Sequence, residues 1–248
     1  TVDDSVRRVL AIKDAIGLFD NPYRSLDPQR ESELDPSDHA ALAREAAQRS
    51  MVLLKNEGKV LPLPKSGKKI ALIGPFAEDR DNLEGFWSLF GDKRIQVNLA
   101  DGLRAAMEDC DDLLVAPGCG FEDAIEGGME AALAAANQAD VVLLAVGEPQ
   151  NYSGEAQSRN QIVLPAVQQA LAEVIAATGK PVVVLLRNGR ALALEGAVRD
   201  ADAIVVTWFL GSQTGTAVAD VVFGDFNPCG KLPVSFPSLV GQQPLYYN

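Results

Sequence analysis

A long loop carrying two carboxylates follows an apolar stretch near the middle of the chain. Residues 141–146 are entirely apolar, and Glu148 and Glu155 lie in the polar segment that comes next. A carboxyl group beside a scissile bond can serve as a general acid or a general base. The loop is long for a connection between a strand and a helix, and long loops are often functional. Both glutamates are therefore candidate catalytic residues, and a solvated acidic loop is the alternative.

Side chains suited to sugar binding accompany these carboxylates. Tyr152 and Arg159 lie in the same loop, and together they offer an aromatic face and a fixed set of hydrogen-bond donors. Trp87 lies outside any helical pattern, where it would be either a stacking platform for a sugar or a core aromatic beneath a loop. Residues 187–190, Arg-Asn-Gly-Arg, follow another apolar run and predict either a tight turn or a set of donors at the mouth of a cleft.

The apolar run before the loop predicts the architecture that must position these residues. Such a run is typical of a strand buried on both faces, as in parallel sheets covered by helices. In open sheets of this kind, ligands bind outside the carboxyl ends of the strands. Because strands alternate with helices along the chain, we predict an α/β fold, a three-layer α/β/α sandwich with a mostly parallel sheet of five or six strands. The clearest predicted strands are residues 69–74, 113–116, 141–146, 181–186 and 203–208.

Helices are predicted from apolar spacing and from glycine and proline signals at their ends. Residues 38–54 are predicted to form one continuous helix, and residues 61–64 an extended connector, because a residue before proline avoids the helical region. The other predicted helices are residues 3–16, 101–107, 122–138, 165–178 and 215–223.

Composition and motifs argue against several classes of function. The net charge of −12 disfavours a nucleic-acid partner, because phosphate binding needs clustered Lys and Arg. The chain has one histidine and three cysteines without C-x-x-C spacing, so we expect no metal site and no disulfide framework. The glycines of residues 118–120 and 211–215 do not complete a dinucleotide-binding motif, so we expect no cofactor. No stretch is long and apolar enough to predict a membrane span.

Motifs distributed over the whole chain point to one family. They are residues 44–56, 61–63, 70–75, 146–148, 155–159, 179–184, 188–189, 208–211 and 219–237. The last of these begins Ala-Asp-Val-Val-Phe-Gly-Asp-Phe-Asn-Pro and is especially specific. Together the motifs resemble the second domain of family 3 glycoside hydrolases, and within that family the chain resembles bacterial periplasmic-type β-glucosidases.

The resemblance implies a retaining glycosidase whose two catalytic groups come from different domains. In the family, an aspartate nucleophile lies in a Ser-Asp-Trp-like segment of a catalytic barrel, and a glutamate of the second domain acts as acid/base. This sequence contains no Ser-Asp-Trp, so the chain alone should not hydrolyse glycosides. By its position before Arg159, Glu155 is the first candidate for the acid/base and Glu148 the second. Trp87, Tyr152 and Arg159 are expected to bind substrate, with Trp87 on the aglycone side.

The resemblance also divides the chain into segments. Residues 1–20 are expected to be the last helix of the preceding barrel, 21–37 a linker, 38–237 the sandwich domain, and 238–248 an exit strap toward a possible third domain. The chain would then be part of a β-glucosidase that removes terminal non-reducing β-D-glucosyl residues. The alternative is a non-catalytic sugar-binding or assembly domain of a related β-xylosidase or exo-glucanase.

The expected partners follow from the same resemblance. They are a β-glucoside or oligosaccharide substrate, the catalytic barrel of the same protein and a possible homodimer, with no nucleic acid and no membrane span. A periplasmic or secreted location is favoured over others.

Overall fold

The computed structural model describes residues 1–27, 29, 39–89 and 91–245, which form two compact units, Thr1–His39 and Ala40–Asn248. In the first unit, helix α1 (Val2–Ala15) has no buried residue. Most of the linker predicted over 21–37, and the last residues of the predicted exit strap, lie outside the described residues. Within the described part of the chain, no helix has both the length and the apolar character needed to cross a bilayer.

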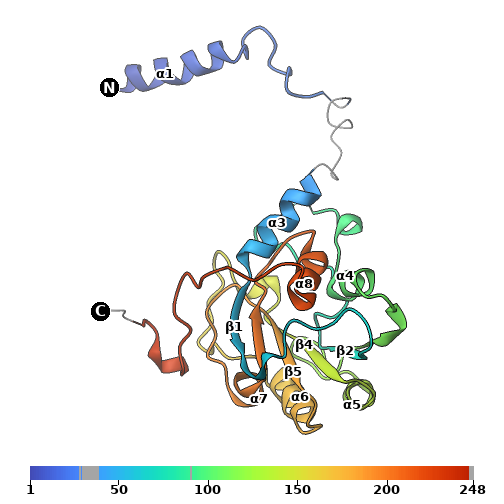
Figure 1. Ribbon diagram of the computed structural model, residues 1–248. Coiled ribbons are helices and arrows are strands. Elements are labelled where there is room, and N and C mark those ends of the chain that lie inside the picture. The colour runs from blue at the N-terminus through green and yellow to red at the C-terminus, as the bar shows by residue number, and fades with distance from the viewer. Residues whose placement is uncertain (28, 30–38, 90, 246–248) are drawn as a thin grey trace. The chain divides into compact units, whose positions relative to one another are not determined.

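The second unit is built on a six-stranded sheet with the order β1-β6-β5-β4-β2-β3 (Figure 1). All neighbouring strands run parallel except β1, which pairs antiparallel with β6 at one edge. The predicted α/β/α sandwich with a mostly parallel sheet is thus confirmed. The strands are β1 (Val52–Asn56), β2 (Ile70–Ile73), β3 (Leu113–Ala116), β4 (Val141–Gly147), β5 (Val182–Arg187) and β6 (Ala203–Val206).

Helices cover both faces of this sheet (Figure 1). On one face lie α3 (Ala40–Ser50), α4 (Leu99–Ala106) and α8 (Thr214–Phe223), and on the other α5 (Gly128–Gln138), α6 (Ala166–Ala176) and α7 (Gly196–Asp200). Short 3₁₀ helices are η2 (Glu57–Lys59), η3 (Lys93–Ile95), η4 (Cys110–Asp112), η5 (Gln150–Tyr152) and η6 (Val240–Gln242).

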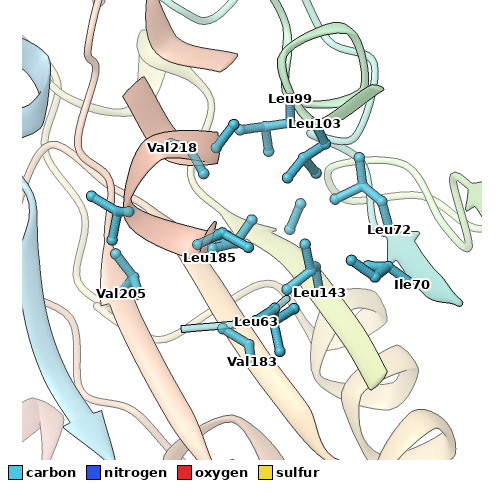
Figure 2. Close-up of a cluster of buried hydrophobic side chains, with 14 of the residues drawn as sticks. Leu63, Ile70, Leu72, Leu99, Leu103, Leu143, Val183, Leu185, Val205 and Val218 are labelled. Carbon is cyan, nitrogen blue, oxygen red and sulfur yellow. The ribbon is translucent and has the colours of Figure 1, made fainter. Parts of the chain in front are cut away.

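The strands divide their side chains between two apolar cores. Successive side chains of a strand point to opposite faces, so Leu143 in β4 joins one core and Leu144 the other. Figure 2 shows the first core, where Leu143 and Leu185 of the sheet lie below Leu103 of α4. All seven residues of β4 are buried, as the apolar run predicted. The strand that leads into the candidate loop is therefore packed between two apolar cores, one on each face of the sheet.

The predicted helix over 38–54 is wrong in its last turn. Helix α3 ends at Ser50, and the chain continues as strand β1, in which Val52 pairs with Val206. The indole Nε1 of Trp208 donates to the Ser50 carbonyl (3.0 Å), which satisfies an acceptor at the end of the helix. Local periodicity favoured a longer helix, and pairing with a distant strand overrode it.

Two further helices differ from the prediction. Helix α5 begins at Gly128 rather than at 122, because Gly127 has a left-handed backbone (φ 70°) and Cys119 forms an isolated bridge with Ala124. Helix α7 was not predicted, since its five residues are too few to show a period.

Candidate functional site

The loop that carries Glu148 and Glu155 leaves the carboxyl end of β4 through a tightly held glycine. Gly147 has a φ of 146°, and a Cβ at this position would lie 1.8 Å from the carbonyl oxygen of Arg187. The buried side chain of Gln168 in α6 accepts from the Gly147 amide (2.8 Å) and donates to its carbonyl (3.0 Å). Both backbone groups of Gly147 are therefore satisfied, and the start of the loop is fixed.

Glu148 is fully buried between two arginines. Its carboxylate oxygens lie 3.5 Å from Nε of Arg159 and 3.3 Å from Nε of Arg190, and its own side chain is 0% exposed. Burial raises the pKa of Glu148, and the nearby charges of Arg190 and Arg159 oppose that rise. The side chain is thus enclosed within this domain, where it meets cations and not solvent.

Glu155 lies in a different environment. It is exposed in a turn, and Ala156 after it has a left-handed backbone with φ 61°. The two carboxylates therefore lie in different environments: Glu148 is enclosed beside the sheet, and Glu155 is exposed to solvent on the loop.

Tyr152 and Arg159, which the sequence placed in one loop, are in direct contact. The guanidinium carbon of Arg159 lies 4.1 Å from the centre of the Tyr152 ring, which is a cation–π arrangement. The pKa of Tyr152 is raised, first by burial and then by the neighbouring Glu122 carboxylate. An open cavity of about 650 Å³ lies beside this pair. It is lined by Glu122, Tyr152, Gln157, Ser158, Arg159, Asn160 and Gln161.

Trp87 is brought to the same loop by its neighbour Phe86. The two rings meet edge to face with centroids 5.4 Å apart, and the Trp87 side chain is 67% exposed. Phe86 packs closely on Gly154, where an added Cβ would lie 2.3 Å from the ring. Trp87 is therefore an exposed aromatic on a loop that rests against the residue before Glu155, and not a core side chain.

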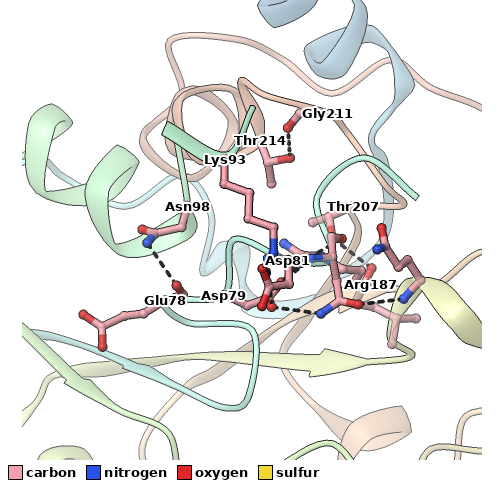
Figure 3. Close-up of polar contacts among 12 residues, drawn as sticks. Glu78, Asp79, Asp81, Lys93, Asn98, Arg187, Thr207, Gly211 and Thr214 are labelled. Atoms are coloured by element: carbon pink, nitrogen blue, oxygen red, sulfur yellow. Dashed lines mark hydrogen bonds and ion pairs between the residues drawn. The ribbon is translucent and has the colours of Figure 1, made fainter. Parts of the chain in front are cut away.

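The first two residues of the segment 187–190, Arg187 and Asn188, are buried inside the domain. Arg187 is fully buried, and its Nη1 lies 3.0 Å from Asp79 Oδ2 (Figure 3). Its guanidinium carbon lies 4.6 Å from the centre of the Phe76 ring. Burial lowers the pKa of Arg187 to about 10, and the charge of Asp79 opposes this. Asn188 donates to the Arg190 carbonyl (2.6 Å), as in a tight turn. Of this segment, Arg190 reaches the loop that carries Glu148 and Glu155.

Sequence reasoning missed Gln168 and the role of Arg190. A glutamine among the apolar positions of α6 was the available signal, because a buried amide needs specific partners. Residues 187–190 were predicted to be a turn or a set of donors, but the partners of Arg190 could not be predicted, since Glu148 and Tyr152 are distant in sequence.

The described residues offer one cluster that could hold a metal ion. Ligand atoms of Asp109, Cys110 and Asp111 lie within 4.8 Å of one another, and all three residues are exposed. Exposed acidic groups are common without an ion. The cluster adds nothing to the loop site.

The chain is similar to a known family and to proteins within it. Residues 51–248 match the model of the glycosyl hydrolase family 3 C-terminal domain. A periplasmic beta-glucosidase of Salmonella typhimurium is 42% identical over 271 residues, a match that covers 100% of this chain and 35% of that protein. A beta-xylosidase of Formosa agariphila is 37% identical over 99% of this chain and 35% of its own length.

Solved structures agree with these similarities. The crystal structure of a beta-glucosidase from Listeria innocua superposes with a TM-score of 0.90 at 39% identity, over 99% of this chain and 33% of that one. The chain thus spans about a third of the length of the relatives it matches.

Proposed function

Since the chain belongs to glycoside hydrolase family 3, we propose that it works as the sandwich domain of a retaining β-glucosidase and supplies the acid/base. In this proposal the domain acts within a longer protein that removes terminal non-reducing β-D-glucosyl residues. The observation that carries the proposal is the exposed Glu155 on a loop whose stem is fixed at the carboxyl end of β4.

In this proposal the nucleophile comes from outside this chain. Retention requires two carboxyl groups about 5–5.5 Å apart across the scissile bond. Glu148 cannot be the second group, because its carboxylate is enclosed between Arg159 and Arg190. The family resemblance assigns the nucleophile to an aspartate of the catalytic barrel. Residues 1–20 would then be the last helix of that barrel.

Glu155 is the better acid/base candidate because it alone of the two is accessible. A group that protonates a leaving oxygen must reach substrate bound outside this domain. Glu155 would donate its proton to the glycosidic oxygen and then take a proton from the water that attacks the glycosyl-enzyme. Exclusion of water by a closed cleft favours the neutral form of a carboxyl, which a general acid needs.

The neighbouring aromatic and cationic groups would hold the sugar. Trp87 is an exposed ring beside the Glu155 loop and would line the aglycone side. Tyr152 has one face covered by Arg159, and the cavity beside this pair is large enough for a sugar unit. These contacts would orient the leaving group toward Glu155.

Kinetics of the full-length protein test the assignment. Glu155→Gln should lower kcat/KM strongly for a glucoside with a poor leaving group. It should lower kcat/KM little for a dinitrophenyl glucoside, because dinitrophenolate leaves without being protonated. It should also remove the basic limb of the pH profile, which reports the general acid. Glu148→Gln should keep that limb. If Glu155→Gln keeps the limb and Glu148→Gln loses it, the assignment is wrong.

The relative described as a beta-xylosidase favours a second substrate class, the β-xylosides. A xyloside lacks the hydroxymethyl group of a glucoside, and the pocket that senses this group would lie mostly in the barrel. The ratio of kcat/KM for matched aryl β-glucosides and β-xylosides decides between the two substrates.

A further inference from the structure

Arg190 links the buried carboxylate to the backbone of the catalytic loop. Its Nε lies 3.3 Å from Glu148 Oε2, and its Nη2 donates to the carbonyl of Tyr152. The side chain is 22% exposed, so most of it is enclosed by the two loops that it joins. Asn188 fixes the backbone of Arg190 through a 2.6 Å hydrogen bond to its carbonyl. One guanidinium group thus serves both Glu148 and Tyr152.

Arg159 makes a second link between the same two residues. Its Nε lies 3.5 Å from Glu148 Oε1, and its guanidinium group covers the ring of Tyr152 at 4.1 Å. Tyr152 and Arg159 are the two ends of the segment 152–159, which contains Glu155. Both ends of that segment are therefore tied to a single buried carboxylate.

The charge balance explains why this arrangement persists. A buried carboxylate is costly unless cations and hydrogen bonds compensate for the water it loses. Glu148 has two guanidinium groups within 3.5 Å, and each of them also contacts Tyr152. Moving the segment 152–159 away from the sheet would pull a cation from a buried anion. That cost opposes displacement of the loop.

We propose that the side chains of Glu148, Arg190 and Arg159 form a clamp, and that this clamp positions Glu155 for proton transfer. Glu148 and Arg190 are positioning residues in this account and act on the reaction through the segment 152–159. The inference rests on the proposed role of Glu155. A displacement of about 1 Å in a reacting group can cost about 100-fold in rate, so the clamp matters to turnover.

Replacing Arg190 by Lys separates its charge from its geometry. A lysine keeps the positive charge near Glu148, but its compact ammonium cannot reproduce the planar fork that reaches both Glu148 and the Tyr152 carbonyl. Arg199→Lys is the matched control, because Arg199 is exposed and pairs with the adjacent Asp200. Both variants conserve the net charge of the protein.

The first readout is amide hydrogen exchange in the full-length protein, and it does not depend on activity. In Arg190→Lys, exchange across residues 150–161 should rise about tenfold, because lysine cannot contact both Glu148 and the Tyr152 carbonyl and the segment then opens more often. Arg199→Lys should leave the same amides unchanged. Equal exchange in the wild type and in Arg190→Lys overturns the clamp.

The second readout asks whether the clamp acts through Glu155. Arg190→Lys should lower kcat/KM more for a poor leaving group than for dinitrophenyl glucoside, as Glu155→Gln does. In the Glu155→Gln background it should have little further effect, because both changes remove the same proton transfer. Equal losses on the two substrates, or full additivity, overturn the positioning role. If the loss of kcat/KM in Glu155→Gln does not depend on the leaving group, the proposed function is wrong. The hydrogen-exchange result then still tests whether the clamp holds the segment 152–159.

Discussion

The guanidinium group of Arg44 donates hydrogen bonds to both carboxylate oxygens of Asp220, which joins α3 to α8 across 176 residues of sequence. Asp220 is almost fully buried, whereas the Arg44 side chain is 44% exposed. Gln48 adds a third hydrogen bond to the same carboxylate (2.6 Å). The pair therefore fastens the helix that enters the domain to the helix that covers the sheet.

Arg44→Ala should destabilise the chain by about 3 kcal/mol, because it leaves a buried carboxylate without its cation. Arg49→Ala on the same helix is the control. Arg49 is exposed and pairs with Glu45 one turn away, so its loss should cost about 0.5 kcal/mol or less. Urea unfolding followed by fluorescence measures both. Equal effects of the two variants would show that Asp220 does not depend on Arg44.

Gly147→Ala should prevent the loop from leaving β4 in its observed path. The added Cβ would lie 1.8 Å from a backbone oxygen, which cannot swing aside, and the φ of 146° is strained for alanine. We expect a loss of more than about 3 kcal/mol in the free energy of unfolding. Gly58→Ala shares a positive φ (66°) but meets no atom within 4 Å, so it should cost about 1 kcal/mol. Thermal melts that rank Gly58→Ala as the worse variant would contradict this account.

The three cysteines should differ sharply in reactivity. Cys110 and Cys229 are exposed, whereas Cys119 is buried and burial raises its pKa to about 11. At pH 8 a thiol reagent should label two cysteines in the native chain and the third only after denaturation. Rapid labelling of Cys119 in the folded chain would contradict the buried position.

The Cys119 thiol also gives a pH dependence with a defined sign. Between the ordinary thiol pKa of 9.0 and the folded-state pKa of about 11, the unfolded chain releases this proton while the folded chain keeps it. Unfolding should therefore become more favourable as pH rises through that window. Comparison with Cys119→Ala isolates this contribution, because the variant lacks the titrating group. A steeper loss of stability in the variant than in the wild type would reverse the sign.

Trp87→Ala should weaken binding of the leaving-group side of a disaccharide. A stacking ring contributes on the order of 1 kcal/mol, so KM for a glucosyl disaccharide should rise about fivefold to tenfold. The kcat for dinitrophenyl glucoside should change little, since dinitrophenolate leaves without stacking on Trp87 and without being protonated. Leu89→Ala is the control, because Leu89 is 80% exposed in the same loop. A larger effect of Leu89→Ala than of Trp87→Ala would show that Trp87 does not bind the leaving group.

The sheet could be predicted from the sequence because its strands are continuous apolar runs. The run in β4 is buried along its whole length, and such runs have few other placements in a folded chain. Strand β1 escaped prediction because residues 52–54 continue the apolar spacing of the preceding helix. Only its pairing with β6 distinguishes it as a strand, and that pairing is invisible to local patterns.

The loop that carries the candidate residues could be located from the sequence, but the residues that hold this loop in place could not. Tyr152 and Arg159 were predicted to lie in one loop, and the structure adds that they are in direct contact. The positions of Gln168 and Arg190 depend on how α6 and β5 pack against β4, so no local pattern reveals their partners. The environments of Glu148 and Glu155 likewise required the structure, because both glutamates lie in one acidic loop of the sequence.

Chemical rescue tests the central claim, that Glu155 is the acid/base, most directly. Glu155→Ala and Glu148→Ala are made in the full-length protein, with dinitrophenyl β-glucoside as substrate and azide as the added nucleophile. Azide needs no general base, so it should accelerate Glu155→Ala strongly and yield β-glucosyl azide as the main product, whereas Glu148→Ala, which keeps the Glu155 carboxyl, should give much less. Formation of β-glucosyl azide by Glu148→Ala, with none from Glu155→Ala, would contradict the account.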